Sequence, residues 1–155
     1  DENIDLLQNG SSVHVWIYFR LSEVFLNYAE ALNESDPGNP DIKKYVDLVR
    51  SRPGVNMPGM TVANQNDVRE FIRNERRVEL AFEDHRAWDT RRWMIADKPE
   101  NLIIRGVKVT IDPYGSFIYQ PVEIEKRVFE PQMYFYPIPE NEINITGWPQ
   151  NPLWK

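Results

Sequence analysis

Proline is distributed unevenly along this chain, and its placement limits where helices can form. Of the 12 prolines among 155 residues, four precede residue 96 and eight fall after residue 98. Proline lacks the backbone N–H that a helix interior uses, and its ring clashes with the preceding turn. We therefore predict a single unit over residues 1–155, with a helical part at residues 1–98 and a hairpin and loop part at residues 99–155.

The helical part begins with two short amphipathic stretches. From about Tyr18 to Asn33, apolar residues recur at intervals of three and four, which is typical of one helical face. A breaker at residues 36–39 ends this stretch. Asn39 suits the cap and Pro40 the first turn of a second helix, which ends near Arg52. Two helices joined by so short a loop predict an antiparallel helical hairpin.

A third helix is predicted over about residues 66–94, which is long for a globular protein. Between Asp67 and Arg92 it carries seven acidic residues and seven arginines. Like charges recur every four residues and form a basic and an acidic column. The basic column is Arg69, Arg73 and Arg77, and the acidic column is Glu75, Glu79 and Glu83. Because such columns destabilise an isolated helix by roughly 0.2–0.5 kcal/mol per pair, neighbouring elements should supply the opposite charges.

The apolar side of this third helix should face the core, between the two charged columns. At about 100° per residue, Phe71, Val78 and Phe82 fall on one face. Trp88 and Trp93 lie near the edges of that face and are expected to be buried. The helix is therefore predicted to pack against other elements on both flanks.

In the last third of the chain the apolar pattern changes to a period of two. Residues 107–111 alternate between apolar and polar side chains, and a second apolar run at residues 117–119 follows a turn. This arrangement predicts a β-hairpin. A further short extended piece is expected around residues 122–128. Trp148 and Trp154, in the proline-rich end, are expected to pack against the helices.

Composition excludes several classes of function. The net charge is −6 and there is no run of Lys or Arg, which argues against a nucleic-acid partner. The absence of cysteine excludes disulfides, thiol catalysis and a cysteine-ligated zinc site. No apolar run approaches the ~18 residues of a membrane-spanning helix. We predict no cofactor and no metal.

The charged residues of the third helix do not indicate an active site. Acid–base pairs need carboxyl groups that converge on one pocket. Glu75, Glu79 and Glu83 instead project from one helix flank beside many arginines, which should keep them ionised. His85 has no second histidine nearby and no HExxH pattern, so we interpret it as a packing residue. The chain is predicted not to be an enzyme.

Four segments resemble motifs of the SusD/RagB family, which comprises outer-membrane nutrient-binding lipoproteins. The segments are FRLSEVFLNYAEALN at 19–33, VRSRPG at 49–54, the run from IRNERRVELAFE to HRAWDTRRW at 72–93, and PIPENEI with QNPLW between 137 and 154. Their order and spread make the resemblance specific. One departure is Leu153, where the family more often has glycine.

The resemblance implies that this chain is the C-terminal portion of a longer protein, exposed on the cell outer membrane, with its lipid anchor in the missing N-terminal part. Such proteins bind glycans or other nutrients and deliver oligosaccharides to a TonB-dependent, SusC-like transporter. Two alternatives stay open: a helical-repeat scaffold for protein interaction, and an accessory region of a glycoside hydrolase. The glycan itself is not predictable from the sequence.

The predicted fold class is mainly α, with tetratricopeptide-like helical hairpins, a small β-hairpin and an irregular Pro-rich C-terminal tail. Most recognisable residues are expected to be structural. They are Arg20, Glu23, Glu30, Arg50, Glu75, Arg76, Glu79, Arg86, Trp88 and Asp89. Sugar rings stack on exposed aromatic side chains, so the candidate ligand contacts are aromatics in or beside loops. These candidates are Trp16, Tyr114 and Tyr119.

Overall fold

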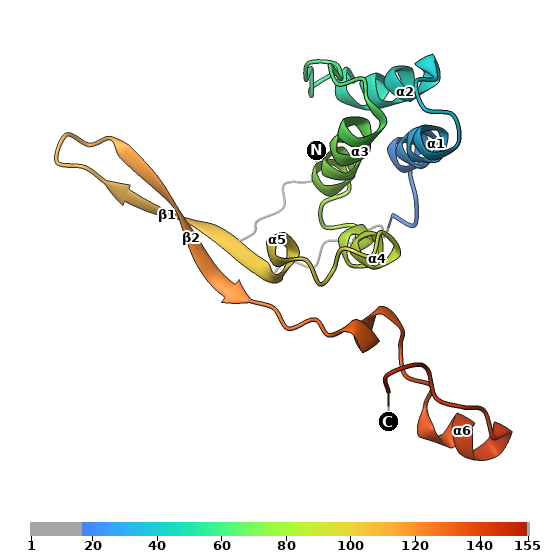
Figure 1. Cartoon of the computed structure of the whole chain (residues 1–155). Coiled ribbons are helices and arrows are strands. Elements are labelled where there is room, and N and C mark those ends of the chain that lie inside the picture. Colours follow the sequence, from blue (N-terminus) through green and yellow to red (C-terminus); the bar gives the residue numbers. More distant parts are fainter. Residues whose placement is uncertain (1–16, 155) are drawn as a thin grey trace. The chain divides into compact units, whose positions relative to one another are not determined.

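The computed structural model describes residues 17–154 (Figure 1). The chain divides into two compact units, with the boundary along the sequence between His85 and Arg86. The first unit holds α1 (Leu21–Ser35), α2 (Pro40–Arg50) and α3 (Gln65–Glu79). Helix α4 (His85–Arg92) begins at the boundary. The second unit continues with α5 (Pro99–Leu102), β1 (Ile103–Ile111), β2 (Phe117–Lys126), the 3-10 helix η1 (Pro131–Tyr134) and α6 (Glu140–Thr146). Within residues 17–154, no helix is both long and apolar enough to cross a membrane.

Helices α1 and α2 form the predicted hairpin. The Asn39 side chain accepts a 3.0 Å hydrogen bond from the backbone N–H of Asp41, and Pro40 occupies the first turn of α2. Gly38 in the connection has φ of +90°, which a residue with a Cβ rarely adopts. The turn chemistry read from the sequence therefore sets the start of α2.

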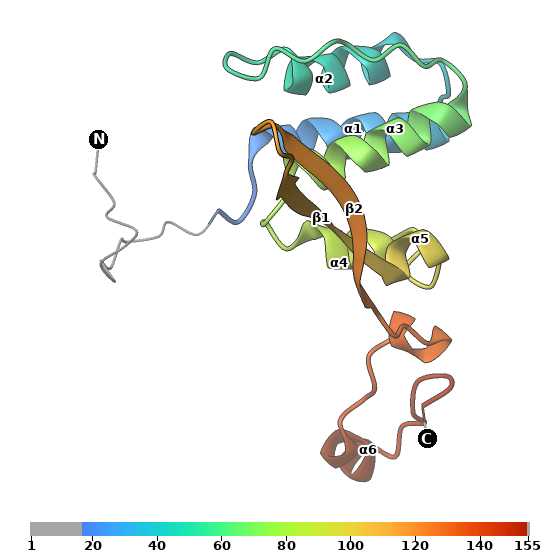
Figure 2. The same cartoon turned by 90° about the vertical axis from the view of Figure 1, so that its left-hand side faces the viewer.

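The core of the first unit lies where α1 packs against α2 and α3 (Figure 2). Ala29 is completely buried, and its small side chain allows close approach between helices. The buried cluster consists of Leu26, Ala29, Ile42, Val46, Val49, Met60, Val68 and Ile72. At roughly 1.5–3 kcal/mol for each large aliphatic side chain, this cluster is the main source of stability in the unit.

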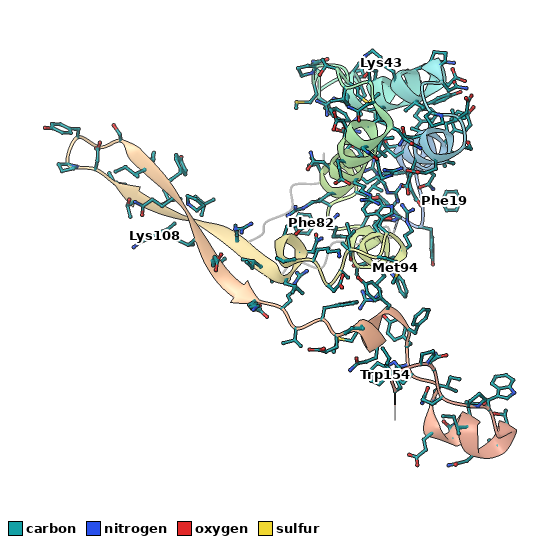
Figure 3. All side chains as sticks on the ribbon, in the orientation of Figure 1. Phe19, Lys43, Phe82, Met94, Lys108 and Trp154 are labelled. Atoms are coloured by element: carbon teal, nitrogen blue, oxygen red, sulfur yellow. The ribbon has the colours of Figure 1, made fainter. Side chains whose placement is uncertain are left out.

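The prediction of one long third helix is wrong, because the helix is broken at residues 80–84. Helix α3 ends at Glu79, and α4 begins only at His85. Phe82 and Asp84 in this connection have φ of 65° and 61°, a left-handed conformation that cannot continue a right-handed helix (Phe82 is labelled in Figure 3). Leu80, which caps α3, is buried and anchors the turn.

The break also changes which aromatic and apolar side chains are buried. Phe71 packs against the core as predicted, but Val78, Phe82 and Trp88 are exposed. For Phe82 and Trp88 the prediction failed because it assumed a constant 100° step through residues 80–84. Val78 precedes the break, and nothing in the structure explains its exposure.

The predicted β-hairpin is present in the second unit as the antiparallel pair β1 and β2. In its turn the Asp112 carboxylate accepts 2.8 Å hydrogen bonds from the backbone N–H groups of Tyr114 and Ser116. The second strand is longer than expected, since residues 122–126 continue β2 instead of forming a separate piece. Pro121 is tolerated because each strand of a two-stranded sheet is an edge strand.

The proline-rich end is held by side chains that bond the backbone. Gln150 exchanges two hydrogen bonds of 2.7 and 2.9 Å with the backbone of Ile138. The Trp154 indole N–H donates to the carbonyls of Gln132 and Phe135 at 3.0 and 2.8 Å. Within the second unit, Trp154 therefore packs on the η1 segment and Trp148 is exposed, whereas the sequence predicted that both pack against the helices.

Candidate functional site

Two arginines converge on Glu79 at the end of α3. Nη1 of Arg20 lies 2.5 Å from Oε1 of Glu79, and Nη1 of Arg52 donates to the same oxygen. Arg20 also donates from Nε to the Glu83 carboxylate at 3.0 Å and from Nη2 to the Glu79 carbonyl. The Glu79 side chain is only 6% exposed. These contacts join the segment before α1, the loop after α2 and the end of α3.

Burial acts to raise the pKa of Glu79, but the hydrogen bonds from Arg52 and Arg20 outweigh it, so this pKa lies below its ordinary value. The hydrogen bond to Glu83 raises the pKa of Arg20. A carboxyl group held ionised in this way is a poor proton donor near neutral pH. The side chains of this cluster therefore form ion pairs that hold the helices of the first unit together.

Glu75 and Arg76 lie next to each other on α3 but face different helices. Glu75 accepts a hydrogen bond from Nη1 of Arg50, whose guanidinium lies 5.0 Å from the Phe71 ring centroid. Arg76 is buried, donates from Nη1 to the Asn27 side chain of α1, and has Nε 3.8 Å from Oε2 of Glu30. The acidic column thus receives arginines from neighbouring elements, as the sequence predicted. In the basic column, Arg69 pairs with Glu34 of α1, whereas Arg73 pairs with Glu70 of its own helix.

Other residues predicted to be structural also contact polar side chains within their own unit. His85 Nε2 lies 3.6 Å from Oε2 of Glu23 in the first unit. In the second unit, Nη2 of Arg86 donates to the Asn101 side chain at 2.6 Å, and the buried Asp89 accepts from Nε of Arg92 at 2.9 Å. Among residues 17–154, no group of three or more side chains is arranged to hold a metal ion.

The candidate ligand contacts are not brought together. Trp16 lies outside the described residues. Tyr114 is almost fully exposed in the hairpin turn, and Tyr119 is exposed on β2, opposite Val109. Between the described rings, no contact joins Tyr114 to Tyr119; the ring near Tyr119 is that of Phe117, at 6.5 Å.

A row of aromatic side chains in the second unit was missed by the sequence analysis. The ring centroids of Trp88 and Tyr136 are 6.0 Å apart, and both side chains are about 60% exposed. The Arg91 guanidinium lies 5.8 Å from the Tyr136 ring and 5.3 Å from the Phe129 ring. We call Trp88, Tyr136, Arg91 and Phe129 the aromatic row. The high density of aromatic residues at 129–136 was the signal that could have indicated it.

Tyr134 packs against Phe129, one member of the aromatic row. Its ring packs edge-on against Phe129 at 4.9 Å, and its hydroxyl donates a 2.6 Å hydrogen bond to Oδ1 of Asp97. Burial raises the pKa of Tyr134, and the tyrosine hydrogen bond lowers the pKa of Asp97. The loop that carries Tyr136 is therefore tied to the segment that follows α4.

The helical hairpin with a third packed helix, followed by a β-hairpin and a proline-rich end, defines a mainly α protein of the helical-repeat class. A profile described as the SusD family matches residues 7–154. The chain belongs to the SusD family.

Individual relatives agree with this assignment. SusD-like protein P2 of Formosa agariphila is 35% identical over 89 residues, which are 54% of this chain and 18% of that protein. A SusD-like protein from Bacteroides fragilis has a crystal structure that matches with a TM-score of 0.74 and 33% identity, over 90% of this chain and 26% of its own. A SusD-like carbohydrate binding protein from the same species matches with a TM-score of 0.62 and 36% identity, over 80% of this chain and 26% of its own.

These matches confirm the predicted tetratricopeptide-like, mainly α fold class. The chain spans about a fifth of the curated relative and about a quarter of the solved ones.

Proposed function

We propose that this chain acts as part of a cell-surface protein that binds glycans and delivers oligosaccharides to a TonB-dependent, SusC-like transporter in the outer membrane. Membership of the SusD family over nearly the whole chain is the observation that carries this proposal. A 36% identical relative described as carbohydrate binding supports a glycan as the ligand. In this proposal the chain is the C-terminal portion of a longer, lipid-anchored protein.

We infer that the chain binds its ligand without chemically changing it. The acidic residues of α3 that resemble a catalytic cluster are engaged by arginines: Arg50 holds Glu75, while Arg20 and Arg52 hold Glu79. Carboxylates committed to such pairs are poor general acids, which supports a binding role.

The three helices of the first unit are proposed to form a rigid platform. Arg76 is buried against α1, Glu75 binds Arg50 at the end of α2, and Glu79 binds Arg20 just before α1. Removing one partner of such a pair leaves a charge poorly compensated, so the network resists partial unfolding. A rigid platform keeps ligand-contacting loops in place.

Within the described chain, the aromatic row has the chemistry best suited to a sugar. Exposed rings such as Trp88 and Tyr136 offer flat apolar faces for the C–H surface of a pyranose. Arg91 beside them carries N–H donors for sugar hydroxyls. Tyr114 is a separate exposed ring on the hairpin turn.

The test is calorimetry and affinity electrophoresis of a full-length SusD-like protein carrying this sequence, against a panel of polysaccharides. We expect saturable binding to at least one glycan and no release of shorter products. Substitution Trp88→Ala should weaken that binding, while Lys44→Ala, at an exposed site on α2, should leave it unchanged. Absence of binding across the panel, or hydrolysis of the bound glycan, would contradict the proposal.

A further inference from the structure

The segment that carries Tyr136 is followed by two prolines, which keep its backbone out of regular secondary structure. Pro137 and Pro139 have no backbone N–H, and a residue that precedes a proline is restricted to an extended conformation. Residues 135–139 accordingly belong to no helix or strand. Because backbone polar groups need hydrogen-bond partners, those of this segment must find them among side chains or in water.

Two neighbouring side chains, Gln150 and Asn151, supply such partners. Gln150 donates from Nε2 to the carbonyl of Ile138 at 2.9 Å, and its Oε1 accepts from the N–H of the same residue at 2.7 Å. A glutamine amide carries the same donor and acceptor as a peptide group, so Gln150 takes the place of a paired strand. Asn151 donates from Nδ2 to the carbonyl of Tyr136 at 2.5 Å.

Trp154 holds the residue that precedes Tyr136. Its indole N–H donates to the carbonyl of Phe135 at 2.8 Å (Trp154 is labelled in Figure 3). Trp154 lies at the end of a turn in which its backbone N–H donates to the carbonyl of Asn151 at 3.2 Å and Leu153 has φ of 68°. We call Gln150, Asn151 and Trp154 the clasp residues. Together they fix the backbone before, at and after Tyr136.

The members of the aromatic row come from two different elements. Trp88 and Arg91 both belong to α4, three residues apart, so one face of that helix positions them. The ring of Tyr136 lies beside them only where its own backbone is held. The hydrogen bond from Tyr134 to Asp97 fixes η1, which ends before Tyr136, and the clasp residues fix the backbone that follows. All of these contacts lie within the second unit.

We propose that Asn151, supported by Gln150 and Trp154, is a positioning residue of the glycan site: it holds the backbone of Tyr136 so that the ring lies beside Trp88 before a sugar binds. This inference rests on the proposed function and adds to it a residue that does not itself touch the sugar. A ring that is already in place loses less conformational entropy on binding. Loss of that order at one side chain weakens binding by about three- to tenfold.

The position of the Tyr136 ring is measured first without any glycan. A full-length SusD-like protein carrying this sequence is labelled with fluorotyrosine, and the fluorine resonance of Tyr136 is assigned by its absence from Tyr136→Phe. Asn151→Asp keeps the size of the side chain and removes the N–H that bonds the Tyr136 carbonyl. We expect the resonance to move toward its position in urea-unfolded protein. Asn144→Asp, the same change at an exposed site on α6, should leave it in place. An unchanged resonance in Asn151→Asp would overturn the proposal.

Glycan affinity is then compared with and without the Tyr136 ring. Soluble starch, xylan, laminarin and pectin are the probes, and the one that the wild type binds most tightly is titrated at a temperature where every variant is folded. We expect Asn151→Asp to weaken binding by about three- to tenfold in the wild type, and by less than about twofold when Tyr136 is already alanine. The difference arises because a positioning residue acts through the ring that it holds.

Equal weakening in both backgrounds, or none in either, would overturn the proposal, because Asn151 would then be structural only. Asn144→Asp is the control for the added negative charge and should leave affinity unchanged. If the wild type binds none of the four probes, the proposed function fails, and the fluorine resonance alone decides whether Asn151 positions the Tyr136 ring.

Discussion

Leu153 is held in a backbone conformation that suits glycine, with φ of 68°. A residue with a Cβ loses roughly 1–2 kcal/mol in the left-handed region, because the side chain crowds the following carbonyl. The resemblance to SusD-family endings, which more often have glycine here, agrees with this geometry. The departure from the family pattern at this position therefore places a residue with a Cβ in the left-handed region.

We therefore expect Leu153→Gly to stabilise the protein by up to about 1 kcal/mol, since relief of strain exceeds the added unfolded-state entropy of glycine. Little hydrophobic burial is lost, because Leu153 is 68% exposed. Urea unfolding followed by tryptophan fluorescence measures the change. Leu153→Ala is the control, which keeps the strained φ and should bring no gain. A glycine variant less stable than the alanine variant would contradict this reasoning.

At the scale of elements, the start of α2 and the β-hairpin were predictable because their signals are local. Asn39 with Pro40 and the turn at residues 112–116 act on the backbone within a few residues. The end of α3 was not predictable from local signals. The segment Leu80 to Asp84 contains neither glycine nor proline, and it breaks where Arg20, 59 to 63 residues earlier, bonds Glu79 and Glu83. Tertiary contacts there override helix propensity.

Glu79 should therefore be essential for the end of α3. In Glu79→Gln the charge disappears while the shape is kept, and Arg20 and Arg52 lose their shared carboxylate. Because both arginines remain partly exposed, we expect a loss of about 1–3 kcal/mol in the free energy of unfolding. Glu70→Gln is the matched control on the same helix; its side chain is 69% exposed, so about 0.5 kcal/mol or less is expected. Equal losses would show that the ion pairs at Glu79 are unimportant.

The same residue predicts a pH dependence of stability. The folded pKa of Glu79 lies below its ordinary value of 4.5, because its arginine hydrogen bonds outweigh the effect of burial. The contribution of the Glu79 carboxylate to the free energy of unfolding is therefore complete above pH 4.5, and it is lost as pH falls through the lower folded pKa. Urea midpoints of the wild type and Glu79→Gln should differ most at neutral pH and converge in acid. A difference that is constant with pH would contradict this assignment.

At the scale of the whole molecule, the sequence predicted the residues that pack the helices better than the residues that form the exposed surface. The charged columns indicated that α3 needs partners on both flanks, and Arg50 supplies one to Glu75 while Glu34 supplies one to Arg69. The aromatic density at residues 129–136 could have indicated part of the aromatic row, but the contact of Trp88 with Tyr136 could not be predicted, because the two are 48 positions apart and meet only in the fold. Packing groups leave a periodic pattern in the sequence, whereas contacts between distant segments leave no such period.

The platform role and the binding role can be separated by paired measurements on the full-length protein. Arg76→Ala removes a buried guanidinium that bonds Asn27 and lies beside Glu30, so the melting temperature should fall by several degrees. Glycan affinity per folded molecule should stay unchanged at a temperature where the variant is folded. Trp88→Ala should show the reverse: because its ring is 59% exposed, the melting temperature should change little while affinity falls by about tenfold. If Arg76→Ala kept its melting temperature and lost affinity, α3 would line the binding site, and the platform interpretation would be wrong.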